Sequence, residues 1–476
     1  MVLDTRPSHA GAGMHPAREA HFCRKGQATL AAGPVPREAR CGLFAEPPVS
    51  PELPAHNRPT LPGMVSQRSC PYYGARWALA PIPDLIHLVH GPVGCAFYGQ
   101  TVRSQEYQLF STDLAEKEVI FGTGEKLYRC LLEAFAVRPG ARGALVYVTC
   151  TPGFLGEDLE ATCRRAEKAT GKRVVLVECP GFCGSSQAAG HDIAAEVLLT
   201  HFIGAGLFEG VRRTAADGVG HSGESAVNLV GEFNVRGDLD VIRSLLAQAG
   251  ITVVCAFNAD APAGRMATAP LADLNLVHCR RTGLALAQGM QAKFDQPYLQ
   301  VSFYGPGNVT ASLREIGAAL GREREVEAVI AAETPAGEKF WRQARRRLEG
   351  GRALLFFGGS RLGSMVGAFQ ELGLEVVVAG SQFGRRDDYT WAWEQVAPGT
   401  LLVDDANEGE IEFLLERYRP HLAVGGTKER YLCLKSGVPF LVFPQEGSPY
   451  AGYRGFTNLA RDIIKALAAP VWRLIR

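Results

Sequence analysis

Short apolar runs alternate with amphipathic helical stretches from about residue 65 onward, and this alternation restricts the fold more than any other feature. Most runs are bounded by Gly, Pro or Asp, as the buried strands of parallel sheets are. The predicted strands are 144–148, 174–177, 227–230, 251–255, 353–357, 376–379, 401–403 and 441–443, and the predicted helices include 158–170, 239–249, 312–320 and 411–418. Because strand–helix–strand crossovers build parallel sheets, the pattern predicts stacked Rossmann-like α/β domains, with ligands beyond the carboxyl ends of the strands.

The composition excludes several classes of protein. At roughly 100–200 residues per domain, 476 residues predict two to four domains. With 50 basic against 49 acidic side chains, we expect neither nucleic acid nor a membrane surface as a partner. No apolar run reaches the ~20 residues of a membrane span, and the N-terminus lacks the apolar region of a signal peptide, so we expect a cytoplasmic protein. No GxGxxG follows a strand and no GxxxxGK[ST] occurs, so nucleotide binding by this chain is not expected.

Three of the twelve cysteines share one setting. Cys70 lies in RSCPYYG, Cys95 ends HGPVGC, and Cys150 closes the apolar run ALVYVTC, so each is placed at a strand end or a Gly/Pro-rich turn. Spacings of 25 and 55 residues are too wide for a zinc ribbon. Thiolates with nearby backbone N–H groups are what an iron–sulfur cluster needs, and a partner chain would supply the missing ligands. Three buried structural thiols are the alternative interpretation.

Several motifs together resemble the α subunit of the nitrogenase component 1 superfamily. They are CPYYGARWALAPIPDLIHLVHGPVGC, TCTPGFLGEDLE, NLVHCRRT, FYGP, GGSR, DDY, TLLVDD and PYAGYRGF, and they span about 65–476. The resemblance implies three Rossmann-like α/β domains around a metallocluster pocket, and a homologous β-type subunit in an α2β2 complex. We expect an irregular extension over 1–64, disordered or wrapped around a partner, then domains over 65–215, 216–350 and 351–476.

The resemblance also assigns the cluster ligands. Cys70, Cys95 and Cys150 correspond to this chain's ligands to a P-type cluster, 8Fe-7S or related, shared with the β-type partner. Cys279 corresponds to the anchor of a large iron–sulfur carbide cofactor of the 8Fe-9S-C type or related. Apart from the resemblance, a thiolate that follows an apolar strand and lies beside Arg280 and Arg281 would suit an anionic cluster. The alternative interpretation of Cys279 is a core or surface thiol without a ligand.

Gln187 and His191, in PGFCGSSQAAGHDI, match the positions of a Gln and a His beside the reactive part of that cofactor. An imidazole donates protons near neutral pH, and an amide orients substrate. Their spacing of four residues also places both on one helical face, as it would for a purely structural pair. Further matches to cofactor-pocket positions are Arg103, Gly358, Gly359, Arg361, Phe383 and Lys428.

The sequence departs from nitrogenase α subunits near its C-terminus. They place a histidine there that binds the heterometal end of the cofactor, but no histidine follows His421 in this chain. Pro444 or Gln445 lies near the position of the missing ligand. The departure argues against dinitrogen reduction on a heterometal–homocitrate cluster and suggests a simpler all-iron carbide cluster.

Catalytic pocket residues without the heterometal ligand resemble the nitrogenase-like methylthio-alkane reductases. That resemblance implies an ATP-dependent iron-protein reductase as electron donor and reduction of C–S bonds in small organosulfur compounds, with release of methanethiol and a hydrocarbon. The alternative is the cofactor-assembly scaffold of the nitrogenase system, which also lacks the histidine but does not keep the Gln and His. A Rossmann-type binding protein without a cluster and the tetrapyrrole reductases of the superfamily fit less well, because neither accounts for Cys279 together with Gln187 and His191.

Overall fold

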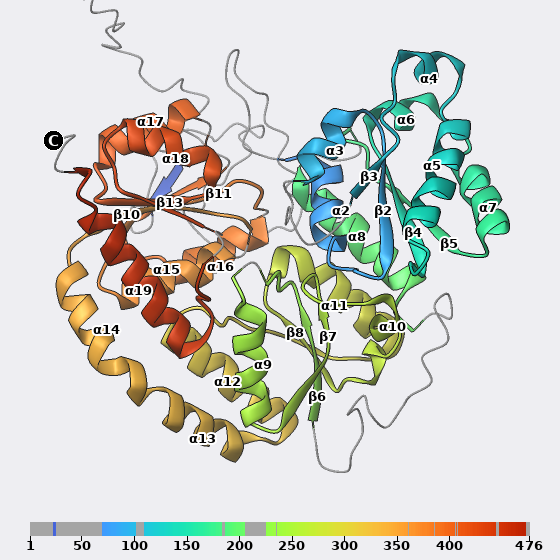
Figure 1. The fold of residues 1–476 in the computed structure, drawn as a ribbon. Coiled ribbons are helices and arrows are strands. Elements are labelled where there is room, and N and C mark those ends of the chain that lie inside the picture. The colour runs from blue at the N-terminus through green and yellow to red at the C-terminus, as the bar shows by residue number, and fades with distance from the viewer. Residues whose placement is uncertain are drawn as a thin grey trace, which may run out of the picture.

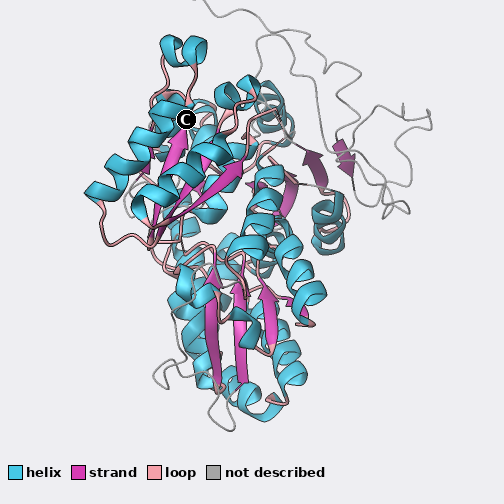
Figure 2. Cartoon of the chain, turned by 90° about the vertical axis from the view of Figure 1, so that its right-hand side faces the viewer, coloured by secondary structure: helices cyan, strands magenta, loops and turns pink. Residues whose placement is uncertain are grey.

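Three α/β units surround a common centre in the computed structural model of the chain (Figure 1). The structure describes residues 22–24, 69–100, 109–182, 186–204, 225–234, 236–359, 361–384, 386–404, 406, 408–443 and 447–472. Each unit has its own largely parallel sheet with helices packed against it, and Figure 2 shows the strands of the second sheet side by side between helices. The prediction of three parallel-sheet α/β domains is confirmed.

The first sheet has the strand order β3-β2-β4-β5 and is entirely parallel. Its strands are β2 (Leu85–His90), β3 (Leu109–Ser111), β4 (Gly143–Val148) and β5 (Arg173–Glu178). The helices of this unit are α2 (Pro71–Leu79), α3 (Val93–Gln100), α4 (Glu116–Phe121), α5 (Gly124–Val137), α6 (Cys150–Leu155), α7 (Leu159–Thr170) and α8 (Gln187–His201). Every residue of β2 and β4 is buried, which is why β4 reads as an unbroken apolar run.

The second sheet, also parallel, has the order β7-β6-β8-β9. Its strands are β6 (Ser225–Val230), β7 (Ile251–Phe257), β8 (Leu274–Val277) and β9 (Tyr298–Gln300). The helices are α9 (Asp238–Gln248), α10 (Ala263–Met266), the 3-10 turn η3 (Ala269–Leu271), α11 (Arg280–Phe294), α12 (Pro306–Leu320), α13 (Glu323–Glu333) and α14 (Pro335–Leu348).

The third sheet has the order β1-β12-β11-β10-β13-β14, with only β1 antiparallel. Its strands are β1 (Phe22–Arg24), β10 (Arg352–Phe357), β11 (Glu375–Ser381), β12 (Leu401–Asp404), β13 (Leu422–Gly425) and β14 (Phe440–Val442). The helices are α15 (Arg361–Glu371), α16 (Arg386–Gln395), α17 (Glu408–Tyr418), α18 (Thr427–Lys435) and α19 (Gly452–Ala468). Strand β1 comes from the segment predicted to be an irregular tail, and the rest of that segment lies outside the described residues.

Hydrophobic cores join the three units into one body. One core contains Leu79 of α2, Phe202 after α8 and Met290 of α11, so it joins the first unit to the second. Another runs from Leu313 of α12 to Phe369 of α15 and joins the second unit to the third. Because the cores are continuous, the carboxyl ends of strands from different sheets are held in fixed positions relative to one another.

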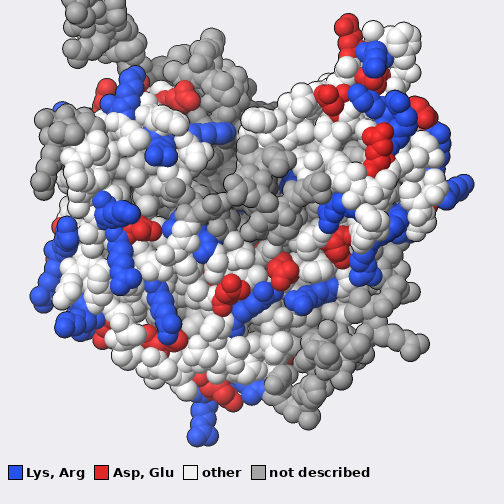
Figure 3. All heavy atoms as spheres, in the orientation of Figure 1, with Lys and Arg blue, Asp and Glu red and all other residues white. Residues whose placement is uncertain are grey.

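The surface charge of the molecule is mixed. Basic and acidic side chains are interspersed on the face that Figure 3 shows, in keeping with the formal net charge of +1. None of the helices that the structure describes has the length and apolar character needed to cross a membrane.

Candidate functional site: a thiol triad and a central cavity

The structure brings Cys70, Cys95 and Cys150 together. Cys70 caps the N-terminus of α2, Cys95 lies in the first turn of α3, and Cys150 begins α6 directly beyond β4. Burial raises the pKa of Cys70 and of Cys95, and the neighbouring Cys150 thiol raises both further. The backbone N–H of Gly181 donates to the Sγ of Cys150 at 3.0 Å. These three residues are called the thiol triad below.

The thiol triad is not built for a single metal ion. Among the residues that the structure describes, no three His, Cys, Asp or Glu side chains are placed to hold one. A cluster is larger than a single ion and is held by thiolates with N–H groups near its sulfurs, which matches this donor set. The raised thiol pKa values mean that positive metal centres, rather than the protein, would have to stabilise the thiolate forms.

Exposed phenylalanine side chains lie on α3 and α6, which carry Cys95 and Cys150, and on α4, which packs against α6. Phe97 of α3, Phe121 of α4 and Phe154 of α6 are 75%, 86% and 75% exposed. The ring of Phe154 packs at 4.2 Å, centroid to centroid, against that of Phe182, which is itself half exposed. Exposed apolar side chains gathered in one region are typical of a protein–protein interface. We call these four side chains the phenylalanine face.

A cavity of about 200 Å³ lies where the three units meet. Its walls come from α2 and α8 of the first unit, from the start of α11 in the second, and from the ends of β10 and β13 in the third. The residues predicted for the site that line it are Gln187, His191, Cys279, Gly358, Arg361, Phe383 and Lys428. Segments far apart in the sequence therefore form one pocket, at the strand ends where parallel sheets bind ligands.

Two predicted pocket residues are not among those that line the cavity. Gly359 is buried at a φ of +52°, and its N–H donates to the Oγ of Ser381 at 3.1 Å. A Cβ at this position would lie 2.8 Å from the Cβ of Arg281, so the close approach and the positive φ together account for glycine. Arg103 lies outside the described residues, as do Pro444 and Gln445.

A chain of polar side chains crosses the cavity wall. The Nε2 of Gln187 lies 3.3 Å from the Nε2 of His191, which is 2% exposed. On the other side of the imidazole, Nδ1 lies 2.9 Å from the Oγ1 of Thr282, which in turn lies 3.6 Å from the Sγ of Cys279. Because an amide nitrogen can only donate, Nε2 of His191 accepts and Nδ1 carries the proton that Thr282 accepts. The hydroxyl of Thr282 is then oriented to donate to the cysteine sulfur.

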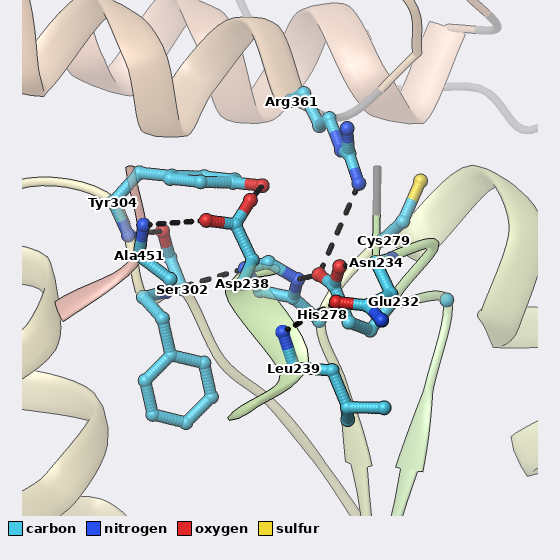
Figure 4. Close-up of polar contacts among 12 residues, drawn as sticks. Glu232, Asn234, Asp238, Leu239, His278, Cys279, Ser302, Tyr304, Arg361 and Ala451 are labelled. Atoms are coloured by element: carbon cyan, nitrogen blue, oxygen red, sulfur yellow. Dashed lines mark hydrogen bonds and ion pairs between the residues drawn. The ribbon is translucent and has the colours of Figure 1, made fainter. Parts of the chain in front are cut away.

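The cavity arginine is held by a buried acidic network (Figure 4). Glu232, at 0% exposure, lies 2.7 Å from the Nδ1 of His278 and 3.9 Å from the guanidinium of Arg361. The backbone N–H of Phe303 donates to the other ring nitrogen of His278 at 3.4 Å, so Nδ1 donates to the carboxylate. Burial by itself would raise the pKa of Glu232, but the hydrogen bond from His278 and the charge of Arg361 lower it to about 2. The network therefore presents a charged Arg361 to the cavity.

The two arginines that follow Cys279 have other partners. Arg281 donates from Nε to the Oδ2 of Asp388 at 2.7 Å, and both side chains are buried. Arg280 donates to the Oε1 of Gln300 at 3.1 Å. Neither of the two lines the cavity, so its positive charges come from Arg361 and Lys428 instead.

Thr282 and Glu429 are cavity residues that the sequence motifs did not predict. Burial raises the pKa of Glu429, and Gln382 donates a hydrogen bond to its Oε1. Its Oε2 is buried with no hydrogen-bond partner within the described part of the chain. The available signal for the hydroxyl was its position three residues after Cys279, which the structure places in the first turn of α11.

Comparison with known proteins relates most of the chain to one family. The sequence model described as "Nitrogenase component 1 type Oxidoreductase" matches residues 70–468. A "Nitrogenase iron-molybdenum cofactor biosynthesis protein NifE" of Methanococcus maripaludis is 37% identical over 436 residues, 89% of this chain and 88% of the relative. A "Nitrogenase molybdenum-iron protein alpha chain" of Methanothermobacter marburgensis is 35% identical over 445 residues, 89% and 92% of the two chains. The solved structure "Nitrogenase Cp1 at pH 5" superposes with a TM-score of 0.82 at 27% identity, covering 97% of this chain and 96% of that one.

Proposed function

Because the chain belongs to the nitrogenase component 1 family as an α-type subunit, we propose that it is the catalytic subunit of a nitrogenase-like reductase that cleaves the C–S bonds of small methylthio-alkanes. The observation that carries the proposal is the polar chain from Gln187 through His191 and Thr282 to Cys279. A proton-carrying imidazole beside the anchoring thiol is a catalytic arrangement, whereas a protein that only holds and passes on a cluster needs no such relay.

The cavity has the groups that a large anionic cluster requires. Cys279 offers a buried thiol at the end of β8, and Arg361 and Lys428 contribute positive charge. The Nε of Arg361 is buried without a hydrogen-bond partner among the residues described, as expected for a donor that faces a bound group. When bound, the cofactor would supply low-potential electrons and iron that binds the substrate's sulfur.

The residues around the cofactor then handle protons and position. The reaction R–S–CH3 + 2 e⁻ + 2 H⁺ → R–H + CH3SH breaks one C–S bond and forms one C–H and one S–H bond. An ATP-dependent iron-protein reductase would be the source of the electrons, and the thiol triad would hold a cluster whose chemistry is electron transfer. His191 would supply protons to the cavity, with Thr282 fixing its ring, and Gln187 would orient the substrate.

The partner subunit is part of the same proposal. The thiol triad is a ligand set that a second chain would complete, and the phenylalanine face beside it offers apolar surface for a β-type subunit. An α2β2 complex would cover this face. The absence of a histidine after His421 supports an all-iron cofactor over a heterometal one.

A second candidate function is that of a scaffold for assembly of the nitrogenase cofactor. The observation that favours it is the 37% identity to cofactor biosynthesis proteins, against 35% for the α chain of a molybdenum–iron protein. The two candidates predict different fates for the bound cluster: a scaffold gives it up to another protein, and a reductase turns over with it.

The test is to co-express the chain anaerobically with its β-type partner and maturation proteins, then add the reductase component, ATP and ethyl methyl sulfide. We expect catalytic release of methanethiol and ethane, abolished by Cys279→Ala. The matched control is Cys163→Ala, which removes a buried thiol of α7 outside the cavity lining and should retain turnover. No turnover, together with transfer of the cluster to apo-nitrogenase, would establish the scaffold instead.

A further inference from the structure

Helix α2 exposes only two side chains, and both are aromatic. Seven of its nine residues are buried, and the exceptions are Tyr73 and Trp77. Their spacing of four residues places them on one face of the helix. Both line the central cavity, so the surface that α2 leaves uncovered is directed there.

The aromatic surface continues on both sides of this pair. The ring of Tyr73 lies 4.5 Å from that of Tyr98 on α3 and 6.1 Å from that of Trp77, measured between centroids. The indole of Trp77 lies 5.6 Å from the ring of Phe233, which follows β6. All four line the cavity, and we call them the aromatic wall. The guanidinium of Arg361 lies 5.4 Å from the ring of Phe233 and marks where the wall ends.

The remaining groups of the cavity have a different chemistry. Cys279 and Thr282 at the start of α11, with Arg361 and Lys428, supply a thiol, a hydroxyl and two positive charges. Those groups suit an anionic cluster, and the aromatic wall offers neither charge nor thiol. An aromatic surface next to a reactive centre binds a neutral, apolar, polarisable molecule, and sulfur makes favourable contacts with aromatic rings.

We propose that Tyr73 and Trp77 form the subsite for the alkyl group of a small neutral thioether and set the chain length that the cavity accepts. The inference rests on the proposed function for the identity of the substrate class, and on the geometry of α2 for the location of the subsite. Charged sulfur compounds would lose hydration against this wall without meeting an opposite charge on it, so they would bind poorly.

The experiment compares Trp77→Ala and Trp77→Phe in the metal-loaded α/β complex, with iron content verifying that each variant assembles. Kinetics are measured with dimethyl, ethyl methyl and butyl methyl sulfide. We expect Trp77→Ala to raise KM for the two shorter thioethers about tenfold with little change in kcat, and to shift the preference toward the butyl compound. Trp77→Phe should restore most of the preference. The control is Tyr431→Ala, an aromatic side chain on α18 that is 77% exposed and outside the cavity lining.

A second readout does not depend on turnover. Partition of dimethyl sulfide between headspace and the resting complex measures binding directly. If the wild-type complex binds dimethyl sulfide without turnover, and Trp77→Ala no longer binds it, the subsite would be supported and the proposed reaction contradicted. Turnover with KM and chain-length preference unchanged in Trp77→Ala would overturn the subsite and leave the reaction standing. No thioether binding by the wild-type complex would overturn the subsite as well.

Discussion

The Nδ1 of His191 lies 2.9 Å from the Oγ1 of Thr282, although the two residues are 91 positions apart in the sequence. The contact fixes which ring nitrogen carries the proton, because Gln187 donates to the other one. The imidazole is therefore held in one tautomer by two helices, α8 and α11, from different units.

Thr282→Val removes the hydroxyl while keeping the side-chain shape. We expect turnover to fall about fivefold, since the loss of one buried hydrogen bond amounts to ~1 kcal/mol and frees the ring. Thr282→Ser should recover most of the rate. Product formation per bound iron, measured across pH, is the readout, and an unaltered pH profile in Thr282→Val would show that the hydroxyl does not act through His191.

His191→Gln removes the proton-carrying ring but leaves a polar side chain of similar reach. If the imidazole supplies protons, product formation should drop by about 10²-fold or more with cofactor content unchanged. The measurement is methanethiol release by complexes of verified metal content. His201 lies on the same helix, outside the cavity lining, so His201→Gln is the control. Turnover at the wild-type rate in His191→Gln would show that His191 does not supply the protons.

Glu232→Gln tests a positioning residue. The pKa of Glu232 is lowered from 4.5 to about 2 in the folded chain, so the ionised carboxylate stabilises the protein above pH ~4.5. That stabilisation is lost as the pH falls from ~4.5 towards ~2. In Glu232→Gln we expect a loss of about 3 kcal/mol at neutral pH, because Arg361 keeps its charge without a carboxylate partner.

The check for Glu232→Gln is denaturant unfolding of the cluster-free chain at several pH values. The variant should lose less stability than the wild type between pH ~4.5 and ~3, since it lacks the group that titrates there. Parallel pH dependences in the two proteins would contradict the assignment. Glu327→Gln is the control, because that carboxylate is half exposed and its ion pair with Arg314 contributes little.

Phe97→Lys tests the phenylalanine face. A charge buried against a partner without compensation disrupts association, so the variant should fail to form the complex with the β-type subunit. Size-exclusion chromatography with light scattering distinguishes the free chain from the complex. Leu271→Lys alters an exposed apolar residue of the second unit and should assemble normally. Assembly of Phe97→Lys at wild-type affinity would show that the β-type subunit binds at another surface.

The sequence predicted those parts of the fold and site that depend on local spacing. All eight predicted strands and four predicted helices exist, because each is a buried apolar run or an amphipathic period bounded by turn residues. The four-residue interval between Gln187 and His191 was likewise enough to place both on one helix face. Six strands were not predicted, namely β1, β2, β3, β8, β9 and β13. Strand β2, for example, reads LIHLVH, and its two histidines interrupt the apolar run.

The contacts that tune the site could not be predicted in this way. Arg281 was expected to favour an anionic cluster, but its partner Asp388 lies 107 positions away in another unit. Glu232 is likewise brought to Arg361 only by the packing of two sheets, and no local pattern marks either pairing. Identification of the thiol triad depended on resemblance to a family, because spacings of 25 and 55 residues say little by themselves.

The packing of α2 against α8 has a consequence for electron flow. A Cβ on Gly74 of α2 would collide with the backbone of Gln187, and one on Gly190 of α8 would collide with the backbone of Pro71, so the two helices touch main chain to main chain. Cys70 precedes the first of these helices and Gln187 begins the second. The thiol triad and the cavity are therefore mounted on a single rigid support. Electron tunnelling slows exponentially with separation, so in the proposed reductase this support would keep the distance between electron donor and acceptor constant while the substrate changes.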